Sequence, residues 1–119
     1  MAIEILLVGD VAAATRRLNE LRLRGFATWL ATSEAELTWL LEKASAHPTH
    51  AVVELASTTG ERAWVLGSRA AVATLAHLPT VVIGAQPDEL RHFEQVIATF
   101  PSEPGTDAII GALRRDAVR

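Results

Sequence analysis

Thr49-His-Ala-Val-Val-Glu-Leu55 is a short apolar stretch that carries one carboxylate, Glu54, near its end. Pro48 precedes this stretch, and the polar residues 57–60 follow it. A valine-rich run of this length between turn residues is typical of a strand that is buried on both faces of a sheet. In an open parallel sheet, binding sites form at the carboxyl ends of the central strands. The stretch therefore indicates both a parallel sheet and a candidate site at Glu54.

Strand-like and helix-like segments alternate along the rest of the chain. The other expected strands are Ile3 to Val8, Phe26 to Ala31, Thr80 to Ala85 and Val96 to Phe100. The expected helices run from Asp10 to Gly25, from Ser33 to His47, from Gly60 to Ala76, over residues 87–95 and from Thr106 to Arg115. Such alternation predicts a parallel sheet with helices on both faces, because each crossover is right-handed. We expect one α/β domain over residues 1–119, doubly wound, with five parallel strands in the order 2-1-3-4-5 and a shortened fourth helix.

Periodicity assigns the faces of the expected helices. In the first helix the apolar positions expected to face the sheet are Val11, Ala14, Leu18 and Leu21. The arginines assigned to its solvated face are Arg16, Arg17, Arg22 and Arg24. In the third helix, Trp64, Ala71, Val72 and Leu75 are expected to point inward. Thr106 is expected to cap the last helix, since a threonine hydroxyl accepts a backbone N–H at that position.

Composition argues against several classes of function. The net charge of −3 disfavours nonspecific nucleic-acid binding, and the lack of cysteine excludes disulfides and thiolate sites. No apolar run approaches the roughly 18 residues of a membrane span, and the first residues lack a basic leader. We therefore expect a cytoplasmic protein without a membrane or nucleic-acid partner. The histidines, expected to contact solvent because they lack metal-ligand spacing, are His47, His50, His77 and His92.

Four segments carry a more specific pattern. They are Ile5-Leu-Leu-Val-Gly-Asp10, Val52-Val-Glu-Leu55, Val81-Val-Ile-Gly-Ala85 and Thr99-Phe-Pro101. In these segments, and in the intervals from Asp10 to Glu54 and from Glu54 to Gly84, the chain resembles the receiver domain of bacterial two-component response regulators, the CheY-like family. The resemblance covers essentially the whole chain.

The resemblance implies a degenerate phosphoacceptor site. Gly9 takes the place of the first acid of the family's acidic pair, and Asp10 keeps the second. Glu54 stands at the phosphoacceptor position, Gly84 at the hydroxyl position and Phe100 at the lysine position. Phosphorylation of a carboxylate needs a divalent cation, and an ammonium and a hydroxyl that hold the phosphoryl oxygens. The chain therefore resembles a pseudo-receiver, which is not an enzyme and lacks conventional aspartyl phosphorylation.

Two interpretations stay open for each acid of this site. Glu54 could mimic a permanently modified state, or it could cap a backbone amide or be solvated at its strand end. Asp10 and Glu54 could together hold Mg²⁺ weakly, or Asp10 could simply cap the first helix. We expect no cofactor. Ser57, Thr58 and Thr59 follow Glu54, but no hydrolase motif frames them.

The resemblance also indicates how such a domain would act. In the family, the face of the fourth helix, fifth strand and fifth helix commonly mediates dimerisation and output. Here that face would contain Leu90, Phe93, Val96, Ile110 and Leu113. We expect a stand-alone signalling domain that binds a protein partner, with a homodimer through this face as one form. If exposed, Trp39 on the second helix and Trp64 on the third could mark contact surfaces, but burial in the core is the commoner fate of tryptophan.

Two alternatives belong to other functional classes. One is a functional response regulator that uses Mg²⁺ in a phosphorelay. The other is a flavodoxin-like module that binds a small ligand in a pocket at the carboxyl rim, between the first and third strands.

Overall fold

The computed structural model describes residues 2–9, 11–55, 64–101 and 105–118. The strands are β1 (Glu4–Gly9), β2 (Ala27–Ala31), β3 (His50–Glu54), β4 (Thr80–Ile83) and β5 (Val96–Phe100). The helices are α1 (Val11–Leu23), α2 (Glu34–Glu42), α4 (Arg69–Leu75) and α5 (Thr106–Ala117), with a 3₁₀ helix, η1, at Glu89–His92. Within these described ranges, no helix is both long enough and apolar enough to cross a membrane.

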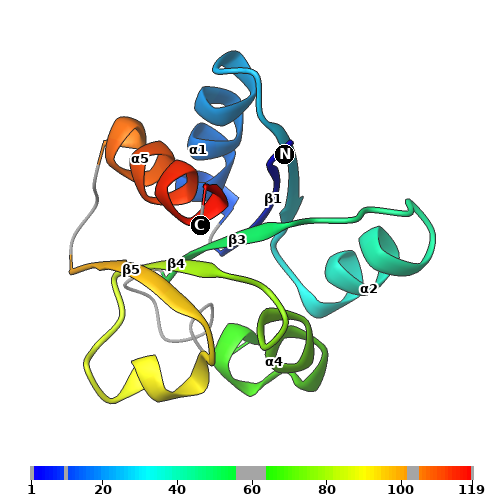
Figure 1. The fold of residues 1–119 in the computed structure, drawn as a ribbon. Helices are drawn as coiled ribbons and strands as arrows, with labels where there is room; N and C mark the ends of the chain where they lie inside the picture. Colours follow the sequence, from blue (N-terminus) through cyan, green and yellow to red (C-terminus); the bar gives the residue numbers. More distant parts are fainter. Residues whose placement is uncertain (1, 10, 56–63, 102–104, 119) are drawn as a thin grey trace.

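All five strands pair in parallel, in the order β2-β1-β3-β4-β5, so the predicted doubly wound sheet is confirmed. Helices α1 and α5 cover one face of the sheet, and α2 and α4 cover the other (Figure 1). The central strand β3 is buried at every residue. This arrangement is that of a flavodoxin-like or CheY-like α/β fold.

Side-chain alternation along β3 decides which way Glu54 points. Val53 belongs to the core cluster beneath α2 and α4, whereas Val52 belongs to the cluster beneath α1 and α5. Residues two apart on a strand face the same side. Glu54 therefore lies on the side of α1 and α5, together with Val52.

The region between β3 and β5 differs in detail from expectation. The single helix expected over residues 60–76 is interrupted: residues 64–67 are helical, and the Ser68 hydroxyl then caps α4 by accepting the Ala71 N–H at 3.2 Å. Val72, expected to face the core, is 39% exposed and that prediction was wrong. The short helix expected over residues 87–95 is confirmed as the single 3₁₀ turn η1.

Two glycines, one at the end of β1 and one just after β4, lie in close contact with the backbone of β3. A Cβ atom on Gly9, at the end of β1, would lie 2.2 Å from the carbonyl oxygen of Glu54. A Cβ atom on Gly84, just after β4, would lie 2.8 Å from the carbonyl oxygen of Leu55, and the Gly84 φ of 80° is one that other residues rarely adopt. These positions hold glycine because the strands approach too closely for a side chain.

We predict that Gly9→Ala lowers the free energy of unfolding by about 2 kcal/mol or more, because the methyl group meets backbone rather than a movable side chain. Urea denaturation followed by circular dichroism measures this change. Gly67→Ala is the control, since no atom lies within 4 Å of its added Cβ, and it should leave stability equal or higher. Equal stability of Gly9→Ala and the natural chain would contradict the close strand approach.

Candidate functional site

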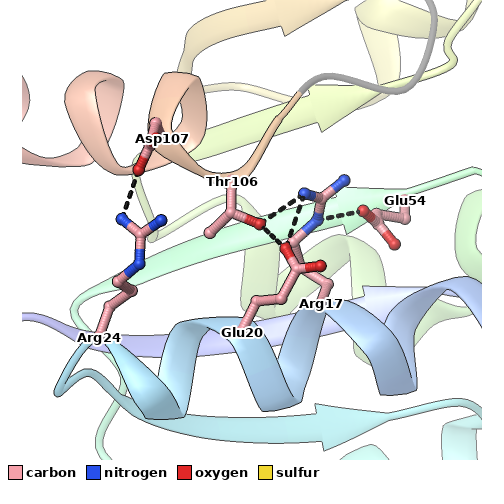
Figure 2. Close-up of polar contacts among 6 residues, drawn as sticks. All are labelled: Arg17, Glu20, Arg24, Glu54, Thr106 and Asp107. Atoms are coloured by element: carbon pink, nitrogen blue, oxygen red, sulfur yellow. Dashed lines mark hydrogen bonds and ion pairs between the residues drawn. The ribbon is translucent and has the colours of Figure 1, made fainter.

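Glu54 ends the central strand, and its carboxylate is buried rather than presented to solvent. The residue is 5% exposed, and its Oε1 accepts a hydrogen bond of 2.8 Å from Nε of Arg17, which is 3% exposed (Figure 2). Glu54 is therefore neither a solvated strand-end residue nor, in its described contacts, the cap of a backbone amide. It is one half of a buried ion pair between β3 and α1.

The burial of Arg17 corrects the expected orientation of α1. Ala14, Arg17 and Leu21 are all buried, whereas Val11 is 59% exposed. The assignments of Arg17 to the solvated face and of Val11 to the sheet were therefore wrong. Spacings of three and four residues join Ala14, Arg17 and Leu21 into one inward stripe. That spacing was the sequence signal for Arg17, but an arginine between two apolar residues was interpreted as exposed.

Arg17 also joins α1 to α5. Its Nη1 donates to Oγ1 of Thr106 at 2.9 Å, and the Thr106 hydroxyl in turn donates to the Glu20 carboxylate. Glu20 Oε2 lies 3.8 Å from Arg17 Nη1. Thr106 was expected to cap α5, but Gly105 holds the N-cap position, and the Thr106 side chain joins these polar contacts instead. We call Arg17, Glu20, Glu54 and Thr106 the Arg17 network.

In the Arg17 network, one guanidinium lies close to two carboxylates that differ in their exposure to solvent. The side chain of Glu20 is 42% exposed and stays partly hydrated, whereas that of Glu54 is 6% exposed. Glu54 Oε2 has no hydrogen-bond partner among the described residues. Burying these charges costs desolvation, and removing one partner would leave the other uncompensated.

The other described positions of the predicted phosphoacceptor site, Gly9, Gly84 and Phe100, bring no reactive side chain to Glu54. Gly84 N–H donates to the carbonyl oxygen of Phe100 at 2.8 Å, and the Phe100 side chain packs, partly buried, against the core beneath α1 and α5. Asp10 lies outside the described residues, as do residues 57–59, so the predicted Mg²⁺ pair of Asp10 and Glu54 is not placed. Among the residues that are described, no three histidines or acids gather as a metal site would require.

The predicted interaction face is largely core. Phe93, Ile110 and Leu113 are 7%, 5% and 0% exposed. Phe93 packs beneath α2 and α4, whereas Ile110 and Leu113 pack beneath α1 and α5. Leu90 is partly buried, and Val96 is 37% exposed. Three of the five side chains therefore do not lie on a surface that a partner could contact.

His50, expected to contact solvent, is instead buried at 3% exposure. Its Nε2 lies 3.0 Å from Oδ2 of Asp116, near the end of α5, and its Nδ1 lies 2.8 Å from Oγ1 of Thr49. The expectation of solvent contact holds for the other three histidines, which are exposed. His50 therefore ties the start of β3 to the end of α5.

An exposed ion pair adds a further link between α1 and α5. The Arg24 guanidinium hydrogen-bonds the Asp107 carboxylate (Figure 2), and this bond together with the charge of Arg24 lowers the pKa of Asp107 below its usual range. Both groups face water, so the pair contributes little to stability. It lies outside the buried Arg17 network.

Two hollows in the surface are lined by described residues. One, of about 500 Å³, lies at the amino rim of the sheet between Ile3, Phe26 and Arg114, where the Arg114 guanidinium is 5.6 Å from the centre of the Phe26 ring. The other, of about 560 Å³, lies over α2 beside Trp39. Neither is at the carboxyl ends of β1 and β3, where a ligand pocket was predicted; residues 10 and 56–63, which follow these strands, lie outside the described residues, so that pocket stays a prediction.

Comparisons of the chain with protein-family models and with curated proteins found no match. A functional proposal for this chain therefore depends on its own fold, contacts and charges.

We predict that Arg17→Met lowers the free energy of unfolding by about 3–5 kcal/mol, because Glu54 remains buried without its cation. Urea denaturation at neutral pH measures the loss. Arg91→Met, at an exposed arginine of η1, is the matched control and should change stability by less than about 0.5 kcal/mol. The double variant Arg17→Met/Glu54→Leu should recover part of the loss, since no charge is then left unpaired. An Arg17→Met protein as stable as the natural chain would rule out a structural role for the pair.

Proposed function

We propose that this chain is a pseudo-receiver, a signalling domain that acts by binding a protein partner and accepts no phosphoryl group on Glu54. The observation that carries the proposal is the buried ion pair between Glu54 and Arg17. The strand order supports it, because Glu54 ends the central strand of a sheet ordered 2-1-3-4-5. Receiver domains place their phosphoacceptor at the same point of the same topology.

Phosphoryl transfer to Glu54 would require a different arrangement of its carboxylate. An attacking oxygen must reach the phosphorus in line with the leaving group, next to a divalent cation. Glu54 is 5% exposed, and its Oε1 is held by Arg17. Turning the carboxylate outward would break this contact and remove one partner of a buried guanidinium, which costs free energy. Gly84 and Phe100 also supply neither the hydroxyl nor the ammonium that would hold the phosphoryl oxygens.

The same ion pair bears on mimicry of a phosphorylated state. A negative charge imitates a phosphoryl group only where it engages the groups that a phosphoryl group would engage. The charge of Glu54 is instead compensated by Arg17, which α1 supplies from within the fold. A partner would therefore recognise the surface of the domain rather than a change of charge at the end of β3.

We expect the intact mass of the chain to stay unchanged after incubation with acetyl phosphate and Mg²⁺. The measurement is electrospray mass spectrometry of the full chain, with a functional receiver domain treated in parallel as the positive control. A Mg²⁺-dependent adduct of one phosphoryl group that is labile in base would contradict the proposal. It would favour a functional response regulator, and Glu54→Gln would then show whether Glu54 is the acceptor.

A further inference from the structure

We propose that the outer face of α2 is a docking surface for a basic segment of a partner protein, which places an arginine or lysine side chain over Trp39. This inference rests on the proposed function, since it names the surface and the chemistry of the partner. We call this surface the α2 face. Its residues are Glu34, Ala35, Thr38, Trp39, Glu42 and Lys43.

Trp39 is the most unusual residue of the α2 face. It is 58% exposed, and its indole N–H has no partner among the described residues. The other two tryptophans are less exposed: the Trp29 indole N–H donates to Glu4 Oε2 at 2.8 Å, and Trp64 packs against the core, where its indole N–H is buried without a partner among the described residues. An indole that leaves its ring and its donor in water offers the contacts that tryptophans make at protein interfaces.

The surface beside Trp39 is hollowed. Ala35 and Thr38 are small, and they lie next to the indole in a depression of about 560 Å³. Residues four apart on a helix lie above one another, so Glu34, Thr38 and Glu42 form one row, and Ala35, Trp39 and Lys43 form the adjacent row. A side chain over the ring would lie beside Thr38, with one carboxylate of the first row a helical turn away on either side.

The charges of the α2 face specify a cation. Glu34 and Glu42 are exposed, and no ion pair joins either of them to another described residue. Glu36, also on α2, already has a hydrogen-bond partner within the chain, because its Oε1 accepts the Thr32 N–H at 2.8 Å. A guanidinium or ammonium over the ring would be attracted to the ring and, at longer range, to the carboxylates of Glu34 and Glu42 one turn away on either side.

Other classes of partner fit the α2 face less well. A purely apolar surface would remove water from Glu34 and Glu42 without replacing their hydrogen bonds, which costs free energy. An acidic segment would meet like charge. Lys43 is the single cation among these residues and lies one turn from Trp39, so two glutamates and one lysine leave the face with a net charge of −1. The complementary occupant is therefore a basic segment.

The test is an NMR titration of the ¹⁵N-labelled full chain with a synthetic helical peptide that carries three arginines spaced four residues apart. We expect saturable shifts confined to α2 and to the Trp39 indole N–H. Trp39→Ala should weaken binding at least about threefold through loss of the cation–π contact. The pair Glu34→Gln/Glu42→Gln should weaken binding and reduce its dependence on salt. Val72→Ala, which trims an exposed apolar side chain on α4, is the control and should leave the affinity unchanged.

Several results would overturn the assignment of the α2 face. They are the absence of saturable shifts, shifts centred on another element, unchanged affinity in Trp39→Ala, or equal binding of a peptide with glutamate in place of arginine. Shifts of α2 that grow with protein concentration in the absence of peptide would identify a second copy of the chain as the occupant. The mass measurement with acetyl phosphate is independent: a phosphoryl adduct would overturn the pseudo-receiver and leave the peptide result unaffected.

Discussion

The buried contact between Arg17 and Glu54 is the constraint on which the helical layer of α1 and α5 depends. It joins the central strand to α1, and Thr106 extends it to the start of α5. At the other end of β3, His50 contacts Asp116 near the end of α5. Helix α5 is therefore attached to β3 near both of its ends, so it cannot slide over the sheet without breaking buried polar contacts.

The carboxyl rim of the sheet departs from a phosphoacceptor site in its backbone as well as in its side chains. An acid at position 9 would carry a Cβ that the carbonyl oxygen of Glu54 does not accommodate, and a hydroxyl residue at position 84 would meet the carbonyl oxygen of Leu55. Restoring the missing groups would therefore require the strands to move apart. The absence of an acid at position 9 and of a hydroxyl at position 84 goes together with the close approach of the strands, because glycine allows the ends of β1 and β4 to lie close to the backbone of β3.

The sheet could be predicted from sequence because its signals are local. Valine-rich runs separated by helical periodicity determine a parallel α/β order without knowledge of any tertiary contact. The polar interior could not be predicted in this way. Arg17 is buried because of a carboxylate 37 residues further along the chain, and His50 because of one 66 residues further along. Periodicity placed Arg17 between Ala14 and Leu21, but a charged residue is interpreted as solvated until its partner is known. Ile110 and Leu113 were also misplaced. They were assigned to a surface by analogy with the receiver family, but they lie in the core.

Among the described residues, the two sides of the sheet differ in how their charged and polar groups are paired. On the side of α1 and α5, Arg17 and His50 pair inside the fold, and Ile110 and Leu113 fill the core. The buried charged groups on that side are therefore paired within the fold. On the opposite side, Glu34, Glu42 and the indole of Trp39 have no described partner. A second molecule can pair with such charges and hydrogen-bond donors at the lowest cost in free energy, because no internal contact has to be broken first.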